Sequence, residues 1–287
     1  MRHPARDLTP LARLAALLAV TLFVTACAPS GGGLSSSSGE GRAERLAQNG
    51  DYQAAAGEYI TLATSATGAE QDRLKLLAVE QWLNAGDTAR ARNTFNTVNQ
   101  PSVAEQRHLW QTNAATLMLY DGDTDAALEI LETLSREPLT RKRRLRVDAL
   151  RADAWIQNED PARAVELMTQ RESMLTSRRD IQSNREHLWQ GLLISDPNVL
   201  RAGAELTLNE NTRGWLTLGS LAASTGQQGI GWVNGAVRWR DTHPGHPAMS
   251  IIDDLDLPKE LILDYPKQIA LLLPLSGRTA RAGPSRC

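Results

Sequence analysis

Four short strings decide the fold of this chain, because each joins the end of one helix to the start of the next. They are NGDYQAA (49–55), AGDTARA (85–91), DGDTDAA (121–127) and NEDPARA (158–164). Their aspartates, with a fifth in SDPNVL (195–200), lie at positions 51, 87, 123, 160 and 196, in steps of 36 or 37 residues. At each step Gly or Asn ends one helix and Asp is expected to cap the next. The period predicts an array of helical hairpins.

Positions at fixed offsets from these aspartates predict the core. Four residues after each Asp lie Ala55, Ala91, Ala127, Ala164 and Leu200, and eight after it lie Tyr59, Phe95, Leu131, Met168 and Ala204. Residues four apart share a helix face, so a small residue beside a larger one is expected where the next helix docks closely. Five and four residues before each Asp, residue pairs are predicted to end the preceding helix: Leu46-Ala47, Trp82-Leu83, Met118-Leu119, Trp155-Ile156 and Gly191-Leu192.

Beyond residue 196 the period is less regular. STGQQGIG (224–231) predicts a sixth turn, in which Gln227 takes the place of the aspartate. THPGHP (242–247) stops the helical pattern, because proline cannot continue a helix. The units resemble tetratricopeptide repeats of slightly greater length. We therefore predict an all-α, tetratricopeptide-like superhelical solenoid of αα-hairpins over 42–250.

Seven tryptophans admit two interpretations. Aromatic faces can stack on sugars, whereas tryptophans at helical positions more commonly fill a core, which is the interpretation that we favour. Trp110 and Trp189 recur in the similar strings RHLWQ and EHLWQ, as repeated packing would produce. The other five are Trp82, Trp155, Trp215, Trp232 and Trp239.

The N-terminal residues have the order of an export signal: arginines, an uncharged apolar run over 14–24, then small residues. The run is shorter than the roughly 20 apolar residues that a transmembrane helix needs. Val24-Thr25-Ala26-Cys27 resembles the bacterial lipobox, which implies cleavage between Ala26 and Cys27 and a lipid on Cys27. The alternative is an ordinary signal peptide with an incidental cysteine.

We therefore expect a lipoprotein signal peptide over 1–26 and a lipid anchor with a Ser/Gly-rich tether over 27–41. Ala28, rather than Asp, follows the cysteine. By resemblance to lipoprotein sorting rules, this residue implies the outer membrane, with the protein facing the periplasm.

The C-terminal part changes character. Residues 251–266 include three closely spaced aspartates and are predicted to form a solvated linker. The apolar run QIALLL (268–273) is consistent with a buried parallel strand, and with the following PLSG it resembles the first strand and loop of type I periplasmic binding-protein domains. We expect 267–287 to be the truncated start of such an α/β domain, or an end that is out of frame. Residues from about 251 onward are expected to be disordered or loosely docked.

The sequence indicates no catalytic, cofactor or metal site. It contains no G-x-S-x-G, no H-E-x-x-H and no C-x-x-C. His243 and His246 flank Pro244 and Gly245 and are interpreted as loop residues rather than metal ligands. The formal net charge of −2 gives no reason to expect nucleic acid as a partner. We therefore predict a protein that is not an enzyme and uses no cofactor.

One charged run is a candidate site. RKRRLR contributes Arg141, Lys142, Arg143, Arg144 and Arg146. Five cations in six residues are able to contact an acidic partner, anionic lipid or peptidoglycan carboxylates. The alternative, which we favour, is a solvated face at the start of a repeat helix.

Together, the lipobox, the tether, the irregular repeat and the string KQIALLLPLSGR (267–278) resemble the LpoA family of penicillin-binding protein activators of Gram-negative bacteria. The resemblance covers essentially the whole chain. It implies an outer-membrane lipoprotein with an N-terminal tetratricopeptide-like domain and a C-terminal domain of the periplasmic binding-protein fold. Members of the family reach across the periplasm to a bifunctional class A penicillin-binding protein and stimulate peptidoglycan synthesis.

The function that this resemblance implies is non-catalytic regulation of peptidoglycan synthesis, with peptidoglycan as a further possible partner. The alternative is a periplasmic ligand-binding or scaffold lipoprotein of the cell envelope. In the family, contact with the synthase is attributed to the C-terminal domain. We therefore expect the chain as printed to bind a class A penicillin-binding protein weakly or not at all.

Overall fold

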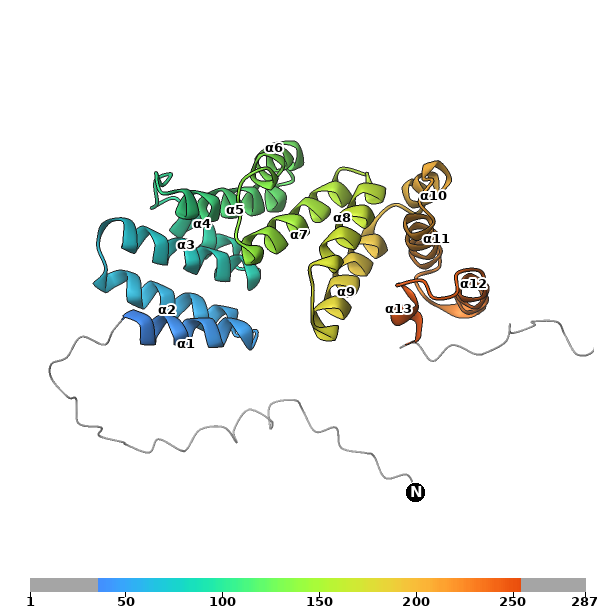
Figure 1. Cartoon of the computed structure of the whole chain (residues 1–287), viewed down its shortest axis with the longest axis horizontal. Helices are drawn as coiled ribbons and strands as arrows, with labels where there is room; N and C mark the ends of the chain where they lie inside the picture. Colours follow the sequence, from blue (N-terminus) through green and yellow to red (C-terminus); the bar gives the residue numbers. More distant parts are fainter. Residues whose placement is uncertain (1–35, 254–287) are drawn as a thin grey trace, which may run out of the picture.

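The computed structural model describes residues 36–253, which form thirteen helices and no strand within that range (Figure 1). The helices are α1 (Ser36–Gln48), α2 (Tyr52–Ser65), α3 (Gly68–Asn84), α4 (Thr88–Phe95), α5 (Ala104–Asp121), α6 (Thr124–Ser135), α7 (Arg141–Gln157), α8 (Pro161–Ser173), α9 (Arg178–Ile194), α10 (Pro197–Leu206), α11 (Glu210–Thr225), α12 (Gly229–Thr242) and α13 (Met249–Asp253).

The helices form an elongated array of antiparallel pairs, running from α1 at the left of Figure 1 to α12 and α13 at the right. The first four pairs are α1 with α2, α3 with α4, α5 with α6, and α7 with α8. Their first helices also pack in order, α3 on α5, α5 on α7 and α7 on α9. This arrangement confirms the predicted all-α solenoid of helical hairpins, in which each unit is stabilised mainly by its neighbours.

The first four turns share one backbone geometry. The residue before each Asp adopts a left-handed conformation, and the Asp N–H then donates to the carbonyl oxygen five residues upstream at 2.9 Å. These bonds join Asp51 to Leu46, Asp87 to Trp82, Asp123 to Met118, and Asp160 to Trp155. The bond satisfies a carbonyl at the end of the first helix and reverses the chain, so it explains why the same strings recur.

The fourth turn differs because Glu159, with φ of 57°, occupies the left-handed position that glycine holds in the other three. A side chain with Cβ is strained in this conformation. We expect Glu159→Gly to raise the free energy of unfolding by about 0.5–1 kcal/mol, since relief of strain exceeds the added entropy of the unfolded chain. Urea unfolding measures the change. The reciprocal control, Gly122→Ala at φ of 78°, is expected to lower stability by about 1 kcal/mol.

The prediction that every turn aspartate caps the next helix is wrong for two of the five. Asp87 and Asp160 accept hydrogen bonds from Arg90 N and Arg163 N, at 2.9 and 3.2 Å, and Asp196 caps α10. Asp51 and Asp123 make no such side-chain bond.

An arginine three residues after the aspartate accounts for the difference between the first four turns. Arg90 Nε and Arg163 Nε also pair with the capping carboxylates, at 2.6 and 3.1 Å, and so hold them over the helix N-terminus. The Arg90 guanidinium lies 4.3 Å from the ring centroid of Trp82, and the Arg163 guanidinium lies 4.4 Å from that of Trp155. Each tryptophan belongs to the preceding helix, and each contact is a cation–π interaction. The other two turns have alanine in place of the arginine.

The fifth predicted turn does not make a hairpin, although a helix break occurs there. Ser195 and Asp196 are extended rather than left-handed, and Gly191 stands where the other turns have a large apolar residue. Because the chain does not reverse, α10 packs mainly on α11 and α8. The sixth turn is confirmed: Gln227 N donates to Ala222 O at 3.3 Å, and α11 packs on α12.

Both ends of the helical region differ from the predicted boundaries. Helix α1 begins at Ser36, inside the segment predicted as a tether, and Glu40 in it pairs with Arg73 of α3 at 2.7 Å. At the other end, Ile251 and Ile252 are buried in the core, so this core extends past residue 250, where the linker was predicted to begin. The predicted strand at 268–273 lies outside the described residues.

The predicted core positions are confirmed. Four residues after each turn aspartate, the four alanines and Leu200 are completely buried. Eight residues after it, every residue is buried except Phe95, which is half-buried and stacks on Trp110. Five of the seven tryptophans are also buried: Trp82, Trp189, Trp215, Trp232 and Trp239.

Two histidines hold the loop after α12 in place. His246 lies with its ring edge-on to Trp239 and Trp215, and its Nδ1 accepts a hydrogen bond from Ala248 N at 3.1 Å. Its Nε2 therefore carries the proton and donates to Asn211 O at 2.8 Å. His243 stacks on the same Trp239.

This arrangement makes stability depend on pH. Burial, with smaller effects from His243 and Arg185, lowers the pKa of His246 below its usual 6.5, against the opposing effect of Asn211 O. The His246 ring binds a proton less readily in the folded state than in the unfolded state. Its contribution to the free energy of unfolding is therefore fully present above pH 6.5 and is lost as pH falls through the folded pKa. Urea unfolding at several pH values should show this loss. His246→Gln should reduce it.

Candidate binding groove

Two adjoining pockets open along the first helices of the hairpins. One, of about 410 Å³, lies among α3, α5, α7 and α9, and the other, of about 380 Å³, lies among α1, α2, α3 and α7. Arg146 and Asn84 line both pockets, so the two adjoin, and we call them together the groove. Each volume is within the range of about 300–1,000 Å³ typical of ligand pockets.

The repeat positions the lining residues. Each of the first four units contributes three side chains to the groove, which lie seven, four and three residues before its turn aspartate. These are Glu44, Ala47 and Gln48; Glu80, Leu83 and Asn84; Thr116, Leu119 and Tyr120; and Asp153, Ile156 and Gln157. Offsets of three and four residues place side chains on one helix face, so the period that forms the array also lines the groove.

Polar contacts between helices hold the groove in shape. Arg143 Nη1 of α7 pairs with Glu80 Oε1 of α3 at 3.2 Å. Tyr120 Oη of α5 donates to Leu83 O of α3 at 3.3 Å. On the far side, Asp153 Oδ1 of α7 lies 2.6 Å from His187 Nε2 of α9.

Arg146 is the exception among these polar groups. Its Nε is buried without a hydrogen-bond partner, and within the described part of the chain its side chain makes no ion pair. A buried donor without a partner carries a desolvation cost, whereas the rest of this half-buried side chain lines both pockets.

The ends of the groove have different chemistry. In the second pocket, burial together with the charges of Glu44, Glu40 and Glu80 raises the pKa of Tyr59 to about 12, so the phenol stays neutral. In the first pocket, Ile194 and Tyr120 are 82% and 53% exposed, which leaves apolar surface at the edge of the groove.

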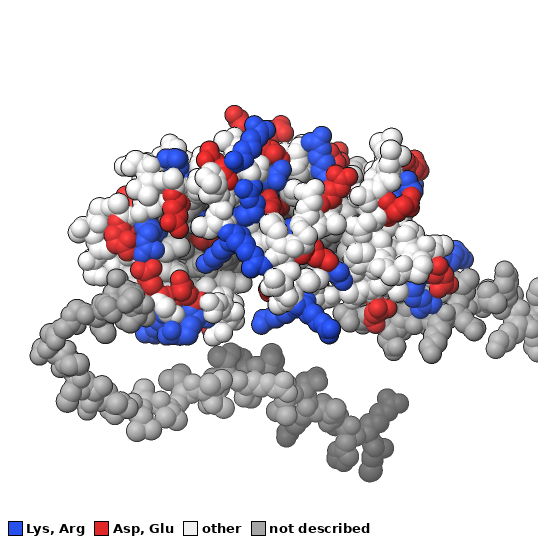
Figure 2. Space-filling model, viewed as in Figure 1, with Lys and Arg blue, Asp and Glu red and all other residues white. Residues whose placement is uncertain are grey.

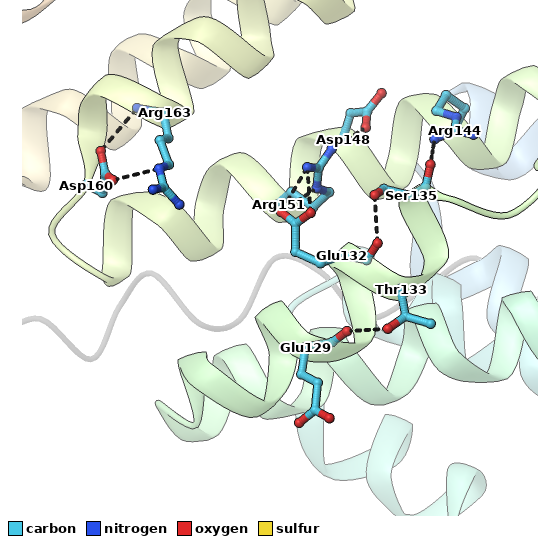
Figure 3. A network of polar contacts seen from close by, with 9 residues as sticks. All are labelled: Glu129, Glu132, Thr133, Ser135, Arg144, Asp148, Arg151, Asp160 and Arg163. Atoms are coloured by element: carbon cyan, nitrogen blue, oxygen red, sulfur yellow. Dashed lines mark hydrogen bonds and ion pairs between the residues drawn. The ribbon is translucent and has the colours of Figure 1, made fainter. Parts of the chain in front are cut away.

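The basic side chains at the start of α7 make separate contacts with different parts of the chain. Arg141 donates to Met174 O, and Arg143 pairs with Glu80. Arg144 donates to Ser135 O, as Figure 3 shows. Lys142 and Arg146 face the groove. Figure 2 shows one face of the molecule, with Lys and Arg side chains over its middle and acidic side chains among them. Contact of the whole run with a partner therefore stays a prediction.

Deeper in the same region, Arg151 joins α7 to α6. Its guanidinium lies between Glu132, at 2.8 Å, and Asp148, at 3.3 Å (Figure 3). This arginine is mostly buried and fully paired, so unlike Arg146 it is a structural cation.

Other predicted sites fall elsewhere. Ala26 and Cys27 lie outside the described residues. None of the seven tryptophans lines the groove. Across residues 36–253 no helix is long and apolar enough to cross a bilayer, and in the same range no three His, Cys, Asp or Glu side chains are grouped to hold a metal ion.

Sequence reasoning did not identify the groove. The signal was present in the repeated offsets before each aspartate, which alternate polar and apolar side chains on one face. The sequence did not show which arginines of α7 are paired. In the structure Arg143 pairs with Glu80 of α3, whereas Arg146, three residues later, has no partner among the described residues.

Stacked helical hairpins with a groove along their first helices define a tetratricopeptide-like solenoid. The chain belongs to the LppC putative lipoprotein family, whose model matches residues 49–285. This match confirms the resemblance noted from the sequence.

Curated relatives carry a functional name. The penicillin-binding protein activator LpoA of Glaesserella parasuis serovar 5 (strain SH0165) is 26% identical over 216 residues, which are 72% of this chain and 36% of that protein. The protein of the same name from Enterobacter sp. (strain 638) is 26% identical over 243 residues, which are 82% of this chain and 32% of that protein. The chain thus spans about a third of the length of these relatives.

Solved structures support the fold. Haemophilus influenzae LpoA superposes with a TM-score of 0.55 at 22% identity, covering 78% of this chain and 41% of that one. The separate N-terminal domain of LpoA from Haemophilus influenzae gives a TM-score of 0.55 at 20% identity, covering 70% of this chain and 92% of that one.

Proposed function

We propose that this protein is a non-catalytic regulator of peptidoglycan synthesis that activates a class A, bifunctional penicillin-binding protein from the periplasmic side. The observation that carries the proposal is the family match over 49–285, together with two relatives that are both named penicillin-binding protein activator. The groove adds support, because a regulator of this kind acts by binding rather than by chemistry.

The proposal includes an outer-membrane location through a lipid on Cys27, after cleavage behind Ala26. The lipobox and the Ser/Gly-rich segment that follows it support this location. Mass spectrometry of the membrane fraction should find a diacylglycerol-linked Cys27, and Cys27→Ser should move the protein out of the outer-membrane fraction. An intact Met1 terminus in that fraction would contradict the proposal.

Activation is tested in the bacterium that carries the protein. Depletion should lower incorporation of labelled precursor into cross-linked peptidoglycan, and re-expression of the wild-type protein should restore it. Re-expressed Cys27→Ser should restore little, because the activator no longer reaches the synthase from the membrane. Unchanged incorporation after depletion would rule out an activating role.

A second assay locates the activating part. Purified residues 36–253, added at saturating concentration to the class A synthase, are expected to stimulate glycan-strand and cross-link synthesis little, since the resemblance attributes synthase contact to a C-terminal domain. Strong stimulation would instead assign activation to the helical array, and Arg141 and Lys142 would be the first residues to replace.

A further inference from the structure

We propose that His246 acts as an acid-sensitive switch: protonation of its ring releases α13 from the core and so moves the point at which the chain leaves the helical array. The switch is separate from the proposed activation and does not depend on it. The inference rests on the hydrogen bonds of both ring nitrogens, on the packing and charges around the ring, and on the shortness of α13.

Both ring nitrogens of His246 are used in the neutral state. Nε2 donates to Asn211 O of α11 at 2.8 Å, and Nδ1 accepts from Ala248 N at 3.1 Å. A protonated imidazole carries a hydrogen on each nitrogen and has no acceptor, so its Nδ1–H faces the N–H of Ala248. Two donors do not pair, and protonation therefore breaks the contact that sets the direction of the chain just before α13.

Close packing prevents the ring from turning to other partners. Trp215 of α11 and Trp239 of α12 lie edge-on to it, with ring centroids 5.8 and 5.0 Å away. Gly214 approaches it so closely that a Cβ there would lie 2.5 Å from Nε2. The ring thus keeps its hydrogen bonds only while it is neutral.

The charged groups nearest to the ring are themselves basic. His243 of α12 lies 6.0 Å from it between ring centroids, and Arg185 of α9 donates to Ser250 Oγ of α13 at 3.4 Å. The carboxylate beside Arg185 is that of Glu172 on α8, which pairs with this arginine at 2.6 Å. A proton on His246 therefore meets like charges, and this repulsion adds to the cost of burying it.

The other charged side chains of α11 and α12 near this loop pair elsewhere. Arg213 pairs with Glu210 on α11, and Arg240 pairs with Asp241 on α12. Burial is the largest effect on the ring, and it lowers the pKa of His246 below 6.5 against the opposing hydrogen bond to Asn211 O. The closed form is thus favoured above pH 6.5 and loses its advantage as pH falls through the folded pKa.

Helix α13 depends on the loop that His246 holds. It has five residues, too few for a helix that is stable by itself, and it packs on α9. Its two isoleucines, Ile251 and Ile252, are buried only while the loop directs them into the core. The helices of the array pack on one another without α13, so release is expected to be local.

Hydrogen exchange followed by mass spectrometry tests the switch on the full chain at pH 7.5 and 5.5, with labelling times scaled for the pH dependence of intrinsic exchange. Protection over 246–253 should fall by between about twofold and tenfold at pH 5.5, since one group allows at most about tenfold one unit below its unfolded pKa of 6.5. Protection in α3 to α8 should not change. A smaller change over 246–253, or an equal change throughout the array, would overturn the proposal.

Two variants assign the change to one ring. His246→Gln does not titrate in this range and should give the same protection of 246–253 at both pH values. His187→Gln is the matched control, because His187 pairs with Asp153 of α7 and lies two residues from Arg185, on another face of α9. It should keep the wild-type change over 246–253. A change that persists in His246→Gln, or is absent from His187→Gln, contradicts the switch.

An NMR titration of the wild-type chain keeps the test decisive even if His246→Gln does not dock α13. The Cε1 proton of His246 should titrate with a midpoint below 6.5, and protection of 246–253 should be lost over the same pH range. A midpoint at or above 6.5, or a loss of protection at a different pH, would rule the switch out.

Discussion

Trp215→Ala is expected to lower the free energy of unfolding by about 3–5 kcal/mol, the largest effect of any substitution considered for this chain. Trp215 lies on α11, is 2% exposed, and packs in the cluster that joins α7 and α8 to α13. Its ring also supports His246, whose centroid is 5.8 Å away. Removal therefore leaves a cavity and frees the loop that ends the array.

Urea unfolding followed by circular dichroism measures this loss. The matched control is Leu208→Ala, an apolar truncation of a side chain that is 93% exposed in the loop before α11, which should change stability by no more than about 0.5 kcal/mol. If Trp215→Ala costs as little as the control, the C-terminal helices do not share one core with α7 and α8.

Ala91→Trp should destabilise the fold by about 1–3 kcal/mol through overpacking. Ala91 on α4 is completely buried and belongs to the cluster formed with α3. Its counterparts Ala55, Ala127 and Ala164 are also completely buried. The close contact of the paired helices leaves no volume for an indole, so the helices have to separate.

Ala89→Trp is the control on the same helix, because Ala89 is exposed and a tryptophan there meets solvent. The two variants carry the same side chain two residues apart, so the difference in their unfolding midpoints reports burial alone. Equal midpoints would mean that the small residue after each turn is not required for helix contact.

Three of the hairpin turns are recognisable in the sequence because each contains a glycine at the end of its first helix. Gly50, Gly86 and Gly122 adopt left-handed conformations that other residues enter at a cost, so their positions carry local information about where helices end. Glu159 adopts the same conformation although it is not glycine, so the fourth turn is predicted from Asn158, Asp160 and the spacing of the repeat.

Sequence alone was sufficient for the helical class, the period, four of the hairpin turns, the sixth turn and the buried face of each repeat, because hydrophobic spacing and turn chemistry act over a few residues. It could not show that α10 leaves α9 for α11, since the neighbours of a helix are set by the whole array. Nor could it separate the five cations of the basic run. Arg143 pairs with Glu80, whereas Arg146 has no partner among the described residues. Only the packing of α7 against α3, more than 60 positions away in the chain, decides which of these charges is paired.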